Sequence, residues 1–276
     1  MTSRLASLTR LPLILAALFT VAACSQEAPP PAPATSAPAT GAPATATPAP
    51  AATAGTEAAA PAPAGPIVPP SGPAPVAGTD YVEIPGGQPF QPGTGKIEVV
   101  EVFGYTCPAC ASFEPQVQAW KARLPADVEF VPVAAPFGGY WMPYAKAYYT
   151  AQAMGLVDKT HEAMFRAIHV ERSLPVQPTP TDTQIAQFYA KFGADPQQFE
   201  STMKSFAINA KLKRAQQFLI SSGVESTPTM LVNGKYRVTG SGFDDTLRIT
   251  EHLIAQERAA GSSAAPAASP ETAAGG

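Results

Sequence analysis

Side chains that bind metal ions are scarce in this chain. Its 276 residues include three cysteines and three histidines, and the histidines (His161, His169 and His252) are isolated from one another in the sequence. A zinc ion in a protein normally has four protein ligands, or three and a water molecule. The composition therefore argues against a metal site. No motif surrounds any of the histidines, so we expect them to have surface or packing roles.

Charged residues and long apolar runs are also scarce. Charged residues make up 14% of the chain, the formal net charge is −3, and no basic run indicates a nucleic acid as the partner. After residue 23, no hydrophobic stretch is long enough to cross a membrane. The bulk of the chain therefore lacks the composition of a nucleic-acid-binding or membrane-spanning protein.

Residues 1–23 have the pattern of an export signal. Arg4 and Arg10 precede an apolar stretch that is too short to span a bilayer comfortably. The stretch ends in the sequence VAAC at residues 21–24, which resembles the lipobox of bacterial lipoproteins and implies cleavage before Cys24 and lipid on that residue. The alternative is an ordinary signal peptide with Cys24 as an incidental thiol. Export places the other cysteines in an oxidising compartment, here the periplasm, and Ser25 favours the outer membrane as the site of the lipid.

Residues 25–80 consist almost wholly of alanine, proline, threonine, glycine and serine. Such a segment has too few apolar side chains to offset the entropy lost on ordering. We therefore predict a disordered linker over residues 24–80 that tethers a folded domain to the lipid, or alternatively a spacer whose length has no role. Residues 260–276 have a similar composition, which predicts a disordered tail. Residues 81–259 remain for one folded domain.

A Cys-Pro-Ala-Cys motif at residues 107–110 lies where a predicted strand ends and a predicted helix begins. Residues 97–103 have the composition of a buried strand, and apolar residues recur at helical spacing after the motif. A helix start favours an anion, so the first sulfur is biased towards the thiolate, and the second can resolve a mixed disulfide. This context favours redox chemistry over a zinc site or an inert structural disulfide.

The other predicted elements are strands on either side of a long helical region. Residues 141–222 show helical patterns and no convincing strand, whereas Asn233-Gly234 between two short apolar runs is a strong hairpin signal. Asp195-Pro196 is a typical start for a helix, which we expect to run towards Gly223. The predicted strands are 81–84, 97–103, 128–134, 229–232 and 236–239, and the predicted helices are 107–124, 141–154, 159–170, 182–192, 196–222 and 244–259.

This order of elements is that of a thioredoxin fold interrupted by an all-helical insertion. Four motifs carry a closer resemblance: VEVF at residues 100–103, CPAC at 107–110, the Phe113-Glu114 pair and GVESTPTMLVNGKY at 223–236. With these motifs, residues 81–259 resemble the DsbA family of periplasmic thiol–disulfide oxidoreductases. The resemblance implies an α/β thioredoxin fold with a central mixed sheet, flanking helices and a helical insertion at about residues 141–222.

The resemblance also implies roles for individual residues. Cys107 is expected to be the nucleophile and Cys110 the buried resolving thiol. Pro228 matches the family's cis-proline, which leaves backbone groups of Thr227 free to pair with a substrate strand; an ordinary trans turn is the alternative. Glu101 matches a buried carboxyl that passes protons to or from Cys110, and the alternative is an edge residue that reaches solvent.

Two positions depart from the strongest oxidants of that family, which carry Cys-Pro-His-Cys. This chain has Pro108 and then Ala109 between the cysteines. Alanine cannot stabilise the Cys107 thiolate as an imidazole does, so we expect a less oxidising couple and a pKa of Cys107 nearer to the thiol reference. Thr227 stands where those oxidases commonly have valine, and threonine there also resembles isomerases and reductases of the superfamily.

The sequence therefore predicts an enzyme that donates its Cys107–Cys110 disulfide to exported proteins with free cysteines, without another cofactor. A quinone-linked membrane protein of the DsbB type is expected to reoxidise it, and lipid on Cys24 is expected to attach it to a membrane. Two alternatives stay open. One is a reductase or isomerase that uses the same site, and the other is a non-catalytic tethered module that binds peptides.

Overall fold

The computed structural model describes residues 65–264. The predicted export signal, Cys24 and most of the predicted linker lie outside the described residues, as does most of the predicted tail. Within the described part, no helix combines the length and the apolar character that a membrane span requires.

Five strands form the sheet at the centre of the domain: β1 (Tyr81–Glu83), β2 (Ile97–Phe103), β3 (Val128–Ala134), β4 (Thr229–Val232) and β5 (Tyr236–Val238). Their order in the sheet is β1-β5-β4-β2-β3. β2 pairs in parallel with β3 and antiparallel with β4, so the strand that leads into the cysteine motif has a neighbour on each side. β2, β3 and β4 have the predicted bounds, and β1 and β5 are slightly shorter than predicted.

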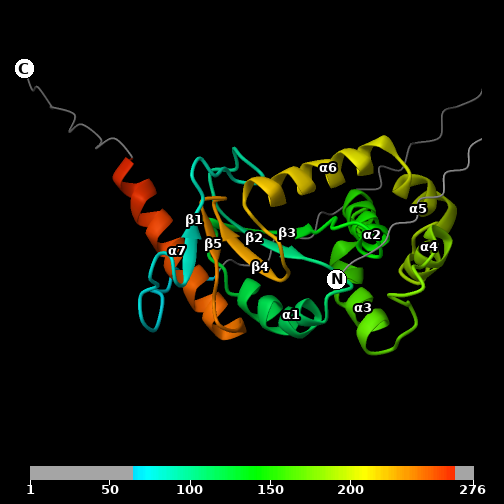
Figure 1. Cartoon of the computed structure of the whole chain (residues 1–276), viewed down its shortest axis with the longest axis horizontal. Helices are drawn as coiled ribbons and strands as arrows, with labels where there is room; N and C mark the ends of the chain where they lie inside the picture. The colour runs from blue at the N-terminus through cyan, green and yellow to red at the C-terminus, as the bar shows by residue number, and fades with distance from the viewer. Residues whose placement is uncertain (1–64, 265–276) are drawn as a thin grey trace, which may run out of the picture. The chain divides into compact units, whose positions relative to one another are not determined.

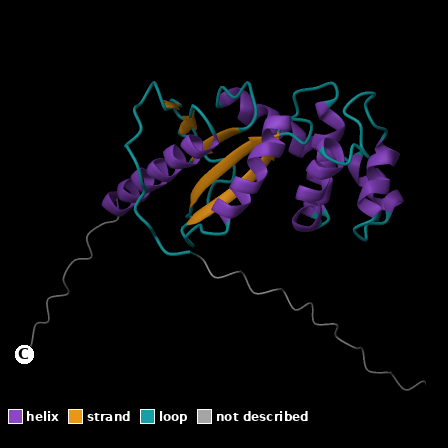
Figure 2. Cartoon of the chain, turned by 90° about the horizontal axis from the view of Figure 1, so that it is seen from below, coloured by secondary structure: helices purple, strands orange, loops and turns teal. Residues whose placement is uncertain are grey.

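Seven helices accompany the sheet in the described part: α1 (Pro108–Lys121), α2 (Trp141–Ala153), α3 (Val157–His169), α4 (Asp182–Ala190), α5 (Pro196–Met203), α6 (Phe206–Ser221) and α7 (Phe243–Ala264). Figure 1 shows α1 and α6 on opposite sides of the sheet, with α2–α5 beside it. The same arrangement is seen from below in Figure 2, where the strands lie between helices. Val99 of β2 packs in one core with Val117 of α1 and Leu253 of α7, whereas the neighbouring Val100 packs in a second core with residues of α2–α6. This is the predicted thioredoxin fold with its helical insertion.

The helix predicted to run from Pro196 towards Gly223 is two helices. α5 ends at Met203, and α6 begins after Ser205. The Ser205 hydroxyl accepts the backbone N–H of Ile208 at 3.3 Å and so caps α6. A serine side chain can satisfy an N–H at a helix start that would otherwise pair with a carbonyl of the preceding turn. The apolar periodicity continues on both sides of the break, which is why the prediction of one helix was wrong.

The predicted linker ends earlier than residue 80, because residues 65–80 pack on the folded domain. The Gly65 N–H donates a hydrogen bond to the Leu124 carbonyl at 2.9 Å, just beyond the end of α1. Further along, Arg248 of α7 donates to the Pro73 carbonyl. The prediction of disorder was wrong here because it did not include the hydrogen-bond partners that α1 and α7 offer. α7 also continues to Ala264, so the first residues of the predicted tail are helical.

Candidate active site

Cys107 caps the N-terminus of α1. Its backbone is extended (φ −86°, ψ 115°), and its sulfur accepts the backbone N–H of Cys110 at 3.3 Å. Pro108 follows at the first helical position, where its missing N–H leaves no donor unpaired. The unpaired N–H groups and the dipole of a helix start favour negative charge at this position. The fold therefore places the first sulfur of the motif where a thiolate is stabilised.

The two cysteines are free thiols in different environments. Cys107 is 7% exposed, whereas Cys110 is fully buried. A hydrogen bond from the Cys110 thiol, with smaller contributions from Thr227 and nearby backbone N–H groups, lowers the pKa of Cys107 to about 6 against the opposing effect of burial. Burial raises the pKa of Cys110 far above its ordinary value. Cys107 is thus the sulfur that ionises, and Cys110 is the one that keeps its proton.

Ala109 contributes to this site through its backbone. Its N–H is among the groups that lower the pKa of Cys107, but its side chain offers no donor. The ordinary pKa of a cysteine thiol is 9.0, so the lowered pKa of Cys107 shows that the thiolate is favoured here without an imidazole at residue 109. The prediction that this pKa lies nearer to the thiol reference than in proteins with Cys-Pro-His-Cys stays a prediction, and the hydrogen bonds from Cys110 and Thr227 are what the sequence alone did not show.

The segment before β4 brings Thr227 and Pro228 to the sulfurs from a distant part of the sequence. The peptide bond between these two residues is cis, so the alternative of an ordinary trans turn does not hold. The Cys107 thiol donates a hydrogen bond to the carbonyl oxygen of Thr227 at 3.4 Å. Both Thr227 and Pro228 are half-buried. A partly exposed segment from far along the sequence therefore lies directly beside the reactive sulfur.

Glu101 lies in the middle of β2 and is 2% exposed. It is in register with Pro132 of β3 and Met230 of β4. Burial, followed by the nearby charges of Glu114 and Cys107, raises the pKa of Glu101 to about 8. The alternative of an edge residue that reaches solvent is wrong, because β2 has a strand on each side. At neutral pH this carboxyl holds a proton close to the sulfurs.

A second buried carboxyl, Glu114 of α1, belongs to a network that the sequence analysis missed. Nε2 of His161 lies 3.4 Å from its carboxylate, and the Gln118 side chain donates to it at 2.6 Å. The other ring nitrogen of His161, Nδ1, is 2.9 Å from the hydroxyl of Tyr105. Tyr105 lies two residues before Cys107 in the connection from β2 to α1. The network thus joins the insertion to the helix and the loop that hold the cysteines.

The three histidines contact different parts of the domain. His161 is buried on α3, His169 places Nε2 2.7 Å from the Tyr105 carbonyl, and His252 places Nε2 3.2 Å from the Ser71 carbonyl. The apolar residues 164, 165 and 168 recur at helical spacing with His161, and this pattern could have placed its ring on the buried face of α3. Nothing in the sequence shows which element that face meets. No cluster of three or more metal-ligating side chains occurs within residues 65–264.

Comparison with known proteins agrees with this geometry. A family model described as a DSBA-like thioredoxin domain matches residues 98–253, more than half of the chain. The chain belongs to this family.

Relatives with this domain carry names that state their chemistry. The thiol:disulfide interchange protein DsbA of Pseudomonas aeruginosa is 42% identical over 169 residues, which cover 60% of this chain and 78% of that protein. The protein of the same name from Azotobacter vinelandii is 40% identical over 169 residues, covering 60% and 77%. The crystal structure of the oxidoreductase DsbA from Xylella fastidiosa is similar with a TM-score of 0.66 and 48% identity, over 67% of this chain and 98% of that chain. This DSBA-like domain is a thiol–disulfide oxidoreductase.

An apolar surface lies beside the cysteine motif of this DSBA-like domain. Trp141 packs so closely on Gly104 that a Cβ atom there would lie 2.1 Å from the indole ring. Phe137 is 41% exposed, and its ring meets that of Trp141 edge-on at a centroid distance of 5.2 Å. The Gly104 carbonyl accepts the Cys107 N–H at 3.0 Å, so the Trp141 ring packs on the loop that leads into the cysteine motif. The sequence analysis missed Phe137 and Trp141 because they follow β3 and lie outside the motif.

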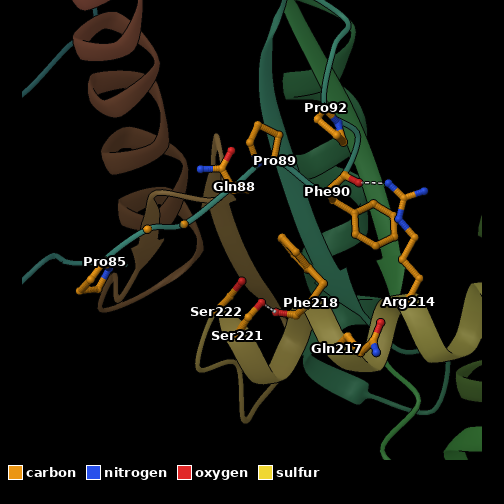
Figure 3. Close-up of a pocket in the computed structure, with 12 residues that line it drawn as sticks. Pro85, Gln88, Pro89, Phe90, Pro92, Arg214, Gln217, Phe218, Ser221 and Ser222 are labelled. Atoms are coloured by element: carbon orange, nitrogen blue, oxygen red, sulfur yellow. Dashed lines mark hydrogen bonds between the residues drawn. The ribbon is translucent and has the colours of Figure 1, made fainter.

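A cavity of about 480 Å³ lies elsewhere in the DSBA-like domain, between the β1–β2 connection and α6 (Figure 3). Phe90 and Phe218 meet in its wall, and the Arg214 guanidinium lies 4.7 Å from the Phe90 ring. Neither the cysteines nor the Thr227-Pro228 segment lines this cavity. The redox site is therefore separate from this hollow.

Proposed function

We propose that this chain is a periplasmic dithiol oxidase, held at a membrane by lipid on Cys24, that transfers its Cys107–Cys110 disulfide to exported proteins with free cysteines. The observation that carries the exchange chemistry is Cys107 at the N-terminus of α1, where its pKa is lowered to about 6, and the oxidase direction is supported by relatives named thiol:disulfide interchange protein DsbA. A stabilised Cys107 thiolate favours the reduced form of the enzyme, and an enzyme whose reduced form is stabilised is a stronger oxidant. The names of its relatives support the same chemistry.

The proposed reaction has two exchange steps. A substrate thiolate attacks the Cys107 sulfur, the Cys107–Cys110 bond breaks, and Cys110 leaves as a thiolate while a mixed disulfide forms. A second substrate thiolate then attacks its partner sulfur in the mixed disulfide, and Cys107 leaves as the thiolate that its low pKa favours. The substrate loses two electrons and gains a disulfide, and the enzyme gains two electrons.

Glu101 supplies the proton that the first step needs. Cys110 leaves into a buried site that raises its pKa far above the ordinary value, so its thiolate takes up a proton. With a pKa of about 8, Glu101 holds such a proton at neutral pH and is a stronger acid than the Cys110 thiol. The carboxylate that this transfer leaves takes up a proton from solvent at neutral pH, because the pKa of Glu101 is about 8, and the Cys110 proton is released when the disulfide is restored.

Extended substrate segments bind along the edge that Thr227 and Pro228 form. Thr227 is half-buried beside Cys107, and its backbone is proposed to pair with a substrate strand. The exposed Phe137 ring, which packs on Trp141 beside Gly104, offers a further apolar contact. Together they suit unfolded chains, which expose backbone groups and apolar side chains.

A quinone-linked membrane protein of the DsbB type is the proposed electron acceptor that restores the disulfide. The export signal and the cysteine at residue 24 support the periplasm and a lipid anchor, with the outer membrane favoured by Ser25. Labelling of cells with radioactive palmitate tests the anchor. The chain takes up label and Cys24→Ser does not, whereas equal labelling of both would remove the anchor from the proposal.

The reduction potential tests the oxidase direction. The mature chain with Cys24→Ser, equilibrated against glutathione mixtures, is expected to have a potential nearer to the roughly −120 mV of a strong disulfide donor than to the roughly −270 mV of thioredoxin. A value close to the thioredoxin end would make the protein a reductase, in line with the threonine at residue 227. If Cys107→Ser leaves both client binding and the cellular phenotype unchanged, the protein would instead be a non-catalytic binding module.

A further inference from the structure

Two buried carboxyls face the same core from different elements. Glu101 is 2% exposed on β2, and Glu114 is 5% exposed on α1, one turn after Cys110. After burial, the charge of Glu114 is the largest cause of the raised pKa of Glu101. Two carboxylates this close in a buried site disfavour each other's charge, so one of them retains a proton. The reaction proposed above requires that the proton reside on Glu101.

The two carboxyls differ in their partners. Glu114 has His161 Nε2 at 3.4 Å and the Gln118 amide at 2.6 Å. No hydrogen bond lowers the pKa of Glu101, which burial and nearby charges raise, and the residues in register with it across the sheet are Pro132 and Met230. Hydrogen bonds to a charged carboxylate stabilise its charge. The partners therefore decide which of the two is ionised.

The His161 ring is held in the orientation that this requires. Its Nδ1 lies 2.9 Å from the Tyr105 hydroxyl, and its faces and edges pack against Phe103 at 4.9 Å and Phe165 at 5.3 Å between ring centroids. The ionised Glu114 carboxylate can only accept a hydrogen bond, so we assign the ring hydrogen to Nε2, and Nδ1 of the neutral ring then accepts from the Tyr105 hydroxyl. His169 holds the carbonyl of the same tyrosine at 2.7 Å.

We infer that His161 is a positioning residue for the disulfide exchange: by binding Glu114, it assigns the proton of the buried carboxyl pair to Glu101. The inference deepens the proposed function and rests on the role proposed there for Glu101. It gives the helical insertion a part in the chemistry, because α3 supplies both His161 and the support for Tyr105. Without this contact, the proton is shared between the two carboxyls and is lost from Glu101 at a lower pH.

Other charged or titratable groups surround the pair and remain unchanged in the test. Lys121 of α1 acts on Glu114, and the Tyr148 hydroxyl of α2 interacts with both carboxyls and with Asp158 of α3. The remaining groups that face the network are Cys107, Cys110 and Tyr189.

The direct test measures the pH at which each of the two carboxyls ionises. The reduced mature chain is labelled with ¹³C at the glutamate carboxyls, and carbon NMR spectra are recorded as the pH is varied. In the unaltered chain, Glu114 is expected to be ionised and Glu101 protonated at pH 7. In His161→Gln, the Glu101 midpoint is expected to fall, and the Glu114 midpoint to rise, each by on the order of one pH unit. His252→Gln is the matched control and leaves both midpoints in place.

Two further results separate this inference from the proposed function. His161→Gln is expected to change the pH profile of exchange with a cysteine peptide, with rates expressed per peptide thiolate, and to have no further effect in a Glu114→Gln background. The inference would be overturned if the midpoints were unchanged in His161→Gln. It would also be overturned if Glu114 were protonated and Glu101 ionised in the unaltered chain, a result that does not depend on whether a variant folds. If Glu101→Gln exchanges at the normal rate while His161→Gln still shifts the midpoints, the assignment of the proton stands and the proposed role of Glu101 fails.

Discussion

The free energy of unfolding of the reduced chain is expected to depend on pH through one sulfur, Cys107. Its pKa is about 6 in the folded state, lowered from 9.0 mainly by the hydrogen bond from Cys110. The unfolded chain therefore binds more protons than the folded chain between these two values, and stability rises with pH in that window. From the two pKa values, the Cys107 contribution grows by on the order of 2–3 kcal/mol between about pH 5 and pH 8. It is lost as the pH falls through about 6.

Cys107→Ser removes this contribution and leaves the rest of the site in place. Urea unfolding of both reduced proteins at several pH values gives the difference in their free energies of unfolding, and this difference is expected to grow with pH. Glu101 acts in the opposite direction because its pKa is raised, and the charge of Cys107 contributes to that rise, so both proteins carry Glu101→Gln in order to isolate Cys107. A difference that is constant from pH 5 to pH 8 would refute the reasoning.

Three further substitutions test other parts of the site. Glu101→Gln is expected to raise the free energy of unfolding at pH 7 by on the order of 3 kcal/mol. The reason is that the native carboxyl, with a folded pKa of about 8, makes the protein less stable as the pH rises above about 4.5. Urea unfolding at pH 4 and pH 7 checks this, and an equal effect at both pH values would contradict it. Ala109→His is expected to raise the reduction potential measured against glutathione, and an unchanged potential would show that an imidazole there does not reach the thiolate. Gly104→Ala is expected to cost about 1–3 kcal/mol in thermal or urea unfolding, because its Cβ would lie 2.1 Å from the Trp141 ring; an unaffected midpoint would mean that Trp141 moves freely.

Local patterns predicted much of this fold. The run of apolar residues gave the bounds of β2, and the Asn233-Gly234 pair gave the hairpin of β4 and β5. The site followed in part, because the position of Cys107 at a helix start is a local feature. That Glu101 is buried could also be predicted, since its neighbours in the strand are apolar.

Contacts between distant segments could not be predicted in the same way. The pairing of Glu114 with His161 depends on how α3 packs on α1, and neither residue carries a local signal for the other. The break at Ser205 depends on one hydroxyl that finds a backbone N–H, within an apolar pattern that continues past it. The pKa of Cys107 depends on its Cys110 partner and on Thr227, which the fold brings in from far along the chain.

The docking of residues 65–80 has a consequence for how the enzyme presents its sulfurs. The chain enters the folded domain at Gly65, which pairs with Leu124 beyond the last turn of α1, while Cys107 caps the first turn. α1 has 14 residues, so at about 1.5 Å per residue these two points are roughly 20 Å apart along its axis. A pull on the chain before Gly65 therefore acts on the end of α1 remote from the thiolate. Within the described residues, the docked segment therefore meets α1 at the end of the helix opposite to the reactive sulfur.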